Sequence, residues 1–336
     1  MAPTDGTLPL FRVSPMFIQR IPAASPAAGP GFYTPGLPPR VAVWAPAKVN
    51  LFLEVLGPRP DGYHEIATLL TSVDLYDTLT LDLDPSGGLS LTSDRSDLSV
   101  GPDNLILRAA NLLKTRSGCS KGAAIHLTKR IPWPAGLGGG SSDAAAALAG
   151  LNDLWELGFS KPELAALGAE LGSDVPFFFN TPAAWCTGRG EVVTTITLGR
   201  PLDIVLVCPE QGLSTAKVYR ELLNGERGPR TVEPKTGSEL AEALAAGDVE
   251  RIARGMFNRL EEAAAKLCPP VAFWLRRLRQ TEAAGCLLSG SGSCVFALCR
   301  DGNEALRVAD AIRSTAAWSG VNGFARTRVF LVRSSI

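Results

Sequence analysis

Residues 131–158, IPWPAGLGGGSSDAAAALAGLNDLWELG, form the stretch that decides the fold. Glycines at positions 136, 138, 139 and 140 separate a proline-broken segment from an alanine-rich run. A glycine backbone can approach a ligand closely because no Cβ stands in the way. The alanine-rich run predicts a helix, since Leu148, Leu151, Leu154 and Trp155 recur at three- and four-residue spacing.

The junction between this loop and the helix predicts an anion site. Ser141 and Ser142 fall in the expected N-cap region, where backbone N–H groups lack helical partners and the positive end of the dipole lies. Phosphate is the usual anion at such a helix start. A flexible surface turn before a helix is the alternative for a glycine-rich run taken alone.

Two familiar phosphate loops do not match. A Walker loop ends in Gly-Lys-Ser/Thr, and no lysine follows Gly140. A dinucleotide fingerprint needs GxGxxG directly after a strand, but the glycine spacing differs and Pro132 and Pro134 interrupt any strand there. The loop therefore belongs to neither class.

Composition limits the classes of protein. A chain of 336 residues forms about two domains. Its 46% hydrophobic and 20% charged residues are typical of a soluble globular protein. Lysine plus arginine equals aspartate plus glutamate at 33 each, which disfavours nucleic-acid binding. No apolar run approaches the roughly 18 residues of a membrane span. We expect a small-molecule partner, no nucleic acid and no membrane.

The seven cysteines are scattered and form no CxxC pair or zinc spacing. This usage predicts reduced, mostly buried structural thiols in a reducing compartment, hence the cytoplasm. Residues 1–40 contain nine prolines and a single acidic residue, Asp5. We expect a poorly ordered extension there; if it is a transit peptide, the location becomes a plastid.

The remaining chain predicts alternating strands and helices. Val49, Leu51, Leu53 and Val55 alternate with polar residues, which places Lys48 and Asn50 together on the opposite strand face. A helix is expected to start at Asp103 or Asn104, and a capping box at Ser160 opens a helix that Gly172 closes. Further strands are expected near 73–83, 123–127, 183–197, 203–209, 286–289, 294–299 and 329–333, and helices near 238–247, 250–264 and 270–283.

Five motifs occur in one order: PAKVNL (46–51), DGYH (61–64), GLGGGSSD (136–143), GSDVPFF (172–178) and SGSGS (289–293). Together they resemble the galactokinase, homoserine, mevalonate and phosphomevalonate (GHMP) kinase superfamily, over about residues 43–335. The first two motifs are similar to those of the branch that phosphorylates the 2-hydroxyl of a cytidyl-bearing polyol in isoprenoid precursor synthesis.

The resemblance implies a two-domain α/β fold of the α+β type. A ribosomal-protein-S5-like, ATP-binding domain would occupy residues 41–199, and a ferredoxin-like α/β domain residues 200–336, with the active site in the cleft between them. The protein would act as a monomer or homodimer.

The resemblance also implies an ATP site with Mg²⁺. The glycine loop would hold the phosphates through Pro134, Ala135, Gly136, Leu137, Gly138, Gly139, Gly140, Ser141 and Ser142. Ser141 or Ser142 would also be available to Mg²⁺. Asn104 would line the adenine pocket, although helix capping explains this residue nearly as well.

The catalytic residues implied are Lys48 and Asp174. Asp174 would accept the proton of the substrate hydroxyl, or would only orient that hydroxyl while Lys48 supplies most of the rate. Lys48 would stabilise developing negative charge, and Asn50 would bind the polyol.

The substrate base would be read by aromatic residues. Tyr63 would stack on cytosine, His64 would hydrogen-bond it, and Tyr219 would cover its other face, with Thr215 beside them on the substrate side. A core position is the alternative for Tyr219. The second loop, 289–293, would close on substrate or phosphates, or is simply a tight turn.

Two other functions stay open. Another kinase of the superfamily, acting on homoserine or mevalonate, would have no base to stack against Tyr63 and His64. A nucleotide-binding protein without catalysis would have no need of Lys48 and Asp174.

Overall fold

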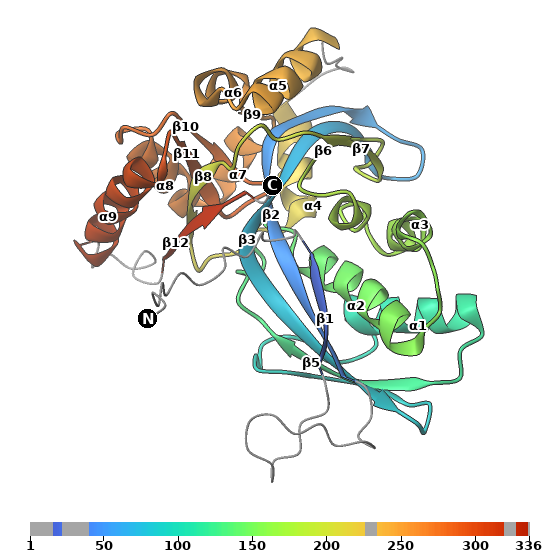
Figure 1. Cartoon of the computed structure of the whole chain (residues 1–336). Coiled ribbons are helices and arrows are strands. Elements are labelled where there is room, and N and C mark those ends of the chain that lie inside the picture. Colours follow the sequence, from blue (N-terminus) through green and yellow to red (C-terminus); the bar gives the residue numbers. More distant parts are fainter. Residues whose placement is uncertain (1–15, 22–39, 226–233, 319–326, 335–336) are drawn as a thin grey trace, which may run out of the picture.

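Two long strands, β2 (Arg40–Pro58) and β3 (His64–Asp84), pair antiparallel through the middle of the molecule (Figure 1). The computed structural model describes residues 16–21, 40–225, 234–318 and 327–334. Figure 1 shows helices on one side of these strands and a second sheet with its own helices on the other. The two strands thus connect the two halves of the protein.

The first sheet is built around this strand pair. Its order is β1 (Phe17–Ile21), β2, β3, β5 (Gly122–Thr128) and β4 (Leu89–Ser93), with β6 (Ala183–Thr187) pairing β3, β7 (Val192–Ile196) pairing β6, and β9 (Phe257–Asn258) pairing β2. The β4–β5 and β2–β9 pairs are parallel and the others antiparallel.

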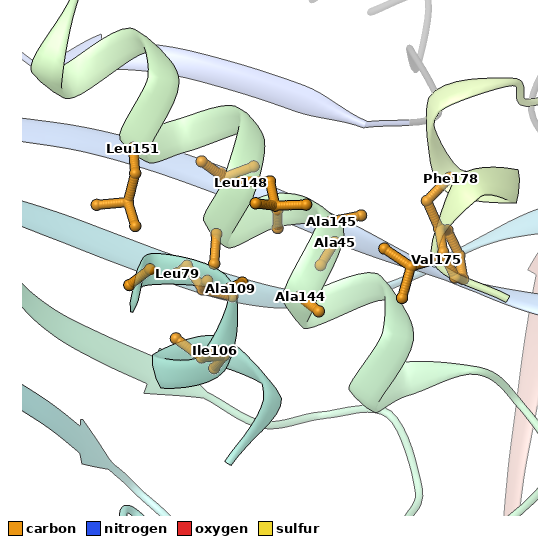
Figure 2. Close-up of a cluster of buried hydrophobic side chains, with 14 of the residues drawn as sticks. Ala45, Leu79, Ile106, Ala109, Ala144, Ala145, Leu148, Leu151, Val175 and Phe178 are labelled. Carbon is orange, nitrogen blue, oxygen red and sulfur yellow. The ribbon is translucent and has the colours of Figure 1, made fainter. Parts of the chain in front are cut away.

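Three helices and a short 3₁₀ turn, η1 (Pro176–Phe179), pack with this sheet: α1 (Leu105–Ser117), α2 (Gly139–Trp155) and α3 (Lys161–Leu171). Figure 2 shows Leu148 and Leu151 of α2 in the cluster that Leu79 of β3 and Ile106 of α1 also join. All four large residues expected on the inner face of α2 are buried. At Gly150, an added Cβ would lie 2.4 Å from Leu81, so the helix rests directly on the sheet.

The second sheet has the order β10 (Gly285–Leu288), β11 (Val295–Cys299), β8 (Asp203–Cys208) and β12 (Arg328–Arg333), all antiparallel. Its helices are α4 (Thr215–Gly225), α5 (Pro234–Ala246), α6 (Val249–Gly255), α7 (Glu261–Leu267), α8 (Pro269–Leu278) and α9 (Gly302–Trp318). Helices separate β8 from β10 and β11 from β12, which is the βαββαβ succession of ferredoxin-like domains. The expected two-part α/β fold is therefore confirmed.

One face of β2 contributes to three cores in succession. Val41, Val43 and Ala45 belong to the cluster under α2, and Ala47, Val49 and Leu51 to a cluster shared with β8 and β11. Leu53 and Val55 join a third cluster with α7 and α8. Lys48 and Asn50, on the opposite face, are each only 3% exposed. The strand is therefore buried on both faces, unlike the half-solvated strand that its alternation suggests.

The single helix expected over 250–264 is wrong. Phe257–Asn258 leaves the helical path as β9 and pairs in parallel with Phe52–Leu53 of β2, between α6 and α7. The Asn258 side chain then donates to the carbonyls of Leu288 and Gly290. Pairing with a distant strand overrides the local helical pattern here, and it ties the second half of the chain to the first sheet.

The extension expected over residues 1–40 contains a strand. Phe17–Ile21 pairs with Arg40–Trp44, and Arg20 forms an ion pair with Asp153 of α2. Residues 1–15 and 22–39 lie outside the described residues. The boundary predicted near residue 200 lies just before β8, which begins at Asp203. Among the helices described, none is both long and apolar enough to cross a membrane.

Candidate active site

A cavity of about 820 Å³ lies where the two halves meet. The glycine loop, β2, the Tyr63–His64 segment, the start of α4 and the second loop all contribute to its wall. Of the residues predicted for the site, those that line it are Lys48, Asn50, Tyr63, His64, Pro134, Ala135, Gly136, Leu137, Gly138, Gly139, Gly140, Ser141, Asp174, Thr215 and Tyr219. The sequence motifs therefore converge on one space.

The glycine loop leads directly into α2, one turn earlier than expected. Gly138 is the N-cap, with φ of 70°, and the N–H of Ser142 makes a helical hydrogen bond to Gly138 O. Ser141 and Ser142 thus lie inside the first turn and do not cap the helix. An added Cβ at Gly138 would lie 2.9 Å from Cγ of Lys48, so only glycine fits this left-handed position. Helix geometry leaves the amides of Gly139, Gly140 and Ser141 free for an anion.

The second glycine loop supports the first. Gly136 has φ of 75°, and a Cβ there would lie 2.0 Å from the carbonyl oxygen of Ser289. Ser289 Oγ donates to Gly136 O at 3.0 Å, and the N–H of Cys294 donates to Ala135 O at 3.0 Å. The loop at 289–293 is therefore more than a local turn, because it fixes the conformation of the expected phosphate loop.

Lys48 and Asp174 meet in this cavity. Lys48 Nζ lies 3.6 Å from Asp174 Oδ2 and donates to Asn50 Oδ1 at 2.7 Å. Asn50 Nδ2 in turn donates to Thr68 Oγ1 at 2.9 Å. Register shifts of β2 at Pro46/Ala47 and Asn50/Phe52 flank the two residues, and such bulges re-aim side chains beside active sites. The lysine is held buried while 34% of the Asp174 side chain is exposed, so the carboxylate can reach a ligand.

Three aromatic side chains form one end of the cavity. The rings of His64 and Tyr219 lie 4.9 Å apart, and Tyr63 is 50% exposed. Burial, together with the charge of Asp174, raises the pKa of the Tyr219 hydroxyl, which therefore stays neutral. The buried Nε2 of His64 has no hydrogen-bond partner, so it is available to a ligand. Thr215 Oγ1 lies 2.8 Å from Ser291 Oγ, which joins α4 to the second loop.

Two predicted ATP-site residues lie outside the cavity wall. Asn104 caps α1: its Oδ1 accepts from the N–H of Ile106, and its Nδ2 donates to Ser99 O. This is the alternative explanation given by the sequence, and the next residue, Leu105, lines the cavity instead. Ser142 is fully buried.

A buried ion cluster anchors the start of α2, and no residue spacing in the sequence indicates it. Lys129 Nζ lies 2.5 Å from both Asp77 Oδ2 and Asp143 Oδ2. Burial raises the pKa of Asp143 to about 7. For Lys129, burial alone would lower the pKa, but the two carboxylates outweigh it and raise the pKa. Lys129 Nζ also lies 3.0 Å from where a Cβ of Gly139 would stand, so the cluster fixes the helix start.

Arg189 is a further residue of the site, and none of the sequence motifs indicates it. It lines the cavity, and its guanidinium lies over the Tyr63 ring at 4.8 Å from the centroid. The only signal was the Gly188-Arg189-Gly190 turn, which by itself indicates nothing beyond a bend.

The residues at the helix start fit a Mg²⁺ ion carried by a nucleotide. Among the described residues, no group of three His, Cys, Asp or Glu side chains could hold a metal by itself. Ser141 lines the cavity, and directly behind it Ser142 Oγ and Asp143 Oδ1 are buried without a hydrogen-bond partner. Mg²⁺ usually takes few protein ligands and completes its shell with phosphates and water.

Family models and relatives agree with this geometry. The model of the GHMP kinases N terminal domain matches residues 104–181, and that of the GHMP kinases C terminal domain matches residues 240–317. A protein of Pelotomaculum thermopropionicum named 4-diphosphocytidyl-2-C-methyl-D-erythritol kinase is 43% identical over 82% of this chain and 94% of its own length. One of the same name from Shouchella clausii is 42% identical over 82% and 91%.

Solved structures show the same relationship. The crystal structure of a 4-(cytidine 5'-diphospho)-2C-methyl-D-erythritol kinase superposes with a TM-score of 0.71 at 36% identity, covering 88% of this chain and 99% of that one. Homoserine kinase from Cytophaga hutchinsonii has a TM-score of 0.69 at 19% identity, covering 91% and 98%, and shares the fold. The chain therefore belongs to the 4-diphosphocytidyl-2-C-methyl-D-erythritol kinase family of the GHMP kinases.

Proposed function

We propose that the protein transfers the γ-phosphoryl group of ATP to the 2-hydroxyl of 4-diphosphocytidyl-2-C-methyl-D-erythritol, giving the 2-phosphate and ADP. This reaction belongs to the non-mevalonate route to isoprenoid precursors. The observation that carries the proposal is the ion pair of Lys48 and Asp174, which lies in one cavity with the glycine loop and the aromatic group.

The glycine loop would bind the triphosphate. The free amides of Gly139, Gly140 and Ser141 would donate to phosphate oxygens at the positive end of α2. Ser141, at the cavity wall, or Ser142 and Asp143 behind it would hold the Mg²⁺ of the nucleotide. When bound, that ion neutralises charge on the phosphates.

Asp174 would receive the proton of the 2-hydroxyl. The hydroxyl oxygen forms a bond to the γ-phosphorus while the bond from that phosphorus to the β–γ bridging oxygen breaks, and its electron pair leaves with ADP. Lys48 would stabilise the negative charge on the transferred group, because its ammonium is buried and already held by Asn50. In the alternative role, Asp174 only orients the hydroxyl.

The aromatic end of the cavity would recognise cytosine. His64 would use its unpartnered Nε2 as a hydrogen-bonding group, and Tyr63 and Tyr219 would supply ring faces. A homoserine or mevalonate substrate has no base, so these groups would have nothing to bind. This favours the cytidyl substrate over the other substrates of the superfamily.

A coupled ADP-release assay tests the proposal. Purified protein with ATP and Mg²⁺ is offered the cytidyl substrate, homoserine and mevalonate in separate reactions at equal concentration. We expect turnover with the cytidyl substrate alone. Turnover only with homoserine or mevalonate would replace the substrate assignment, and ATP binding without turnover of any of the three would favour a non-catalytic nucleotide-binding protein.

A further inference from the structure

Arg189 is a cation in the cavity wall, and its side chain is held by a backbone carbonyl and an aromatic ring. Its Nη2 donates to the carbonyl of Ala169 at 2.6 Å, and its guanidinium covers one face of the Tyr63 ring. Within the described part of the chain, no carboxylate forms a salt bridge with it. The nearby Asp61 forms its salt bridge with Arg59, whose hydrogen bond is the main cause that lowers the pKa of that carboxyl; the charge of Arg189 adds a smaller lowering effect from a longer distance. Buried or half-buried arginines usually have an anionic partner.

The turn that carries Arg189 is held in place from several sides. The N–H of Gly188 donates to Glu65 Oε1, and Gly188 O accepts from the N–H of Ile66. The backbone N–H of Arg189 donates to Glu191 Oε2 at 2.7 Å. Gly188 has φ of 71° and Gly190 has φ of 119°, positions that favour glycine. The arginine is thus presented on a fixed turn, which limits the entropy lost when it binds a ligand.

The turn that carries Arg189 contacts both the aromatic end of the substrate site and the segment that carries Asp174. Arg189 touches Tyr63 at the aromatic end. The next residue of the turn, Gly190, lies against the segment of Asp174, because a Cβ added at Gly190 would stand 3.5 Å from Cβ of Ser173. The proposed substrate has cytosine at one end, the reacting polyol at the other, and a diphosphate between them. A substrate that spans from Tyr63 to Asp174 therefore brings its diphosphate past Arg189.

The positive charges of the cavity wall also point to the substrate diphosphate as the ligand of Arg189. Among the described residues, the cationic side chains in the cavity wall are Lys48, Arg189 and Arg220. Lys48 forms an ion pair with Asp174 and a hydrogen bond with Asn50. The ATP phosphates would bind the amides of the glycine loop. We infer that the guanidinium of Arg189 binds the diphosphate of the cytidyl substrate and so sets the specificity for a cytidine diphosphate over the bare nucleoside. This inference rests on the function proposed above.

Binding measurements without ATP isolate this contact. The wild-type protein, R189A and R189K are titrated calorimetrically with cytidine, cytidine monophosphate and cytidine diphosphate. We expect the wild type to bind the diphosphate more tightly than cytidine. In R189A most of that gain is lost, about ten- to hundredfold, with cytidine affinity little changed. R189K retains part of the gain, because lysine keeps the charge but not the planar fork.

Steady-state kinetics supply the second measurement. For R189A we expect a higher KM for the cytidyl substrate and an unchanged KM for ATP. The matched control is R116A, which removes an exposed arginine that is paired with Glu170 near the end of α3, beside the residue that Arg189 contacts. This control should behave as wild type in both measurements.

Three outcomes would overturn the inference. The first is an undiminished gain from cytidine to cytidine diphosphate in R189A, and the second is loss of that gain in R220A instead. The third is a fall in kcat alone, which would place Arg189 at the transferred phosphoryl group. Failure of the proposed function looks different: the wild type itself would not turn over the cytidyl substrate, whatever the titrations show.

Discussion

Lys48 Nζ lies 3.6 Å from Asp174 Oδ2, although one residue belongs to the long strand β2 and the other follows helix α3. The same lysine side chain packs against Gly138, the N-cap of α2. The buried ammonium of Lys48 therefore faces the expected proton acceptor, while the aliphatic stem of the same side chain lies against the expected phosphate loop. This is the place where a phosphoryl group can be positioned between nucleotide and acceptor.

Asp174→Asn should lower kcat by about 10² to 10⁴, because an amide cannot accept the hydroxyl proton. ATP affinity should survive, since the loop that holds the phosphates is unchanged. Single-turnover phosphoryl transfer and ATP titration measure the two effects separately. Wild-type turnover by this variant would mean that the proton goes elsewhere.

Lys48→Met keeps the aliphatic stem against Gly138 but removes the charge. We expect kcat to fall by about 10² to 10³, the usual effect of losing one preorganised electrostatic contact in an active site. Lys121→Met is the control, because that lysine binds the Trp155 carbonyl outside the cavity. An equal loss in both variants would point to general destabilisation instead of chemistry.

Gly136→Ala tests the contact between the two loops. The left-handed φ costs an alanine about 1 kcal/mol, and the Cβ would also overlap the carbonyl of Ser289. Gly158→Ala is the matched control, with φ of 78° and nothing within 4 Å of the added atom. We expect G136A to lower the free energy of unfolding more than G158A, and to raise the KM for ATP roughly tenfold or more. Equal stability of the two variants in urea would contradict the close approach.

Asp143→Asn should change how stability depends on pH. The carboxyl has a pKa of about 7 in the folded protein and of about 4 when unfolded. Between these values the folded state holds a proton that the unfolded state releases, so the carboxyl favours folding at low pH and this contribution is lost as the pH rises towards 7. Asparagine does not titrate, and Lys129 keeps Asp77 as its partner. Relative to wild type, the variant should therefore gain stability from pH 5 to pH 8 in denaturant titrations; parallel curves would show that Asp143 does not titrate there.

Tyr219→Phe and Tyr219→Leu separate stacking from hydrogen bonding. The hydroxyl is neutral and partly buried, so we expect the phenylalanine variant to keep a near-wild-type KM for the cytidyl substrate. The leucine variant should raise that KM about two- to twelvefold, the worth of one aromatic pair. ATP kinetics serve as the internal reference. A large effect of Tyr219→Phe would instead assign the hydroxyl a direct contact.

Local sequence patterns predicted the features that depend on neighbouring residues. The four glycines before an alanine-rich run predicted a loop entering a helix, because backbone freedom and helical periodicity are properties of the segment itself. The capping box at Ser160 and the cap at Asn104 were predictable for the same reason. The ordered motifs also led to the family, and with it to Lys48 and Asp174.

Other features depend on residues far apart in the chain. The break of the expected helix at Phe257 follows from pairing with β2, and β1 follows from pairing with Arg40–Trp44. The N-cap of α2 is Gly138 and not one of the serines, and Lys48, 90 residues earlier, leaves no space for a Cβ at this position. The sequence had no means of giving Arg189 a role, since its importance comes from the side chain of Tyr63 and the carbonyl of Ala169.

The amino-acid sequence by itself determined the phosphate loop, the strand that carries Lys48, and the kinase superfamily, because each of these depends on short segments of contiguous residues. Only the tertiary structure decided which charges face each other: Lys48 pairs with Asp174, Lys129 pairs with Asp77 and Asp143, and Arg189 has no salt bridge to any residue that the structure describes. The physical reason is that electrostatic and packing energies depend on distance in space, and the fold alone sets that distance for residues in different segments.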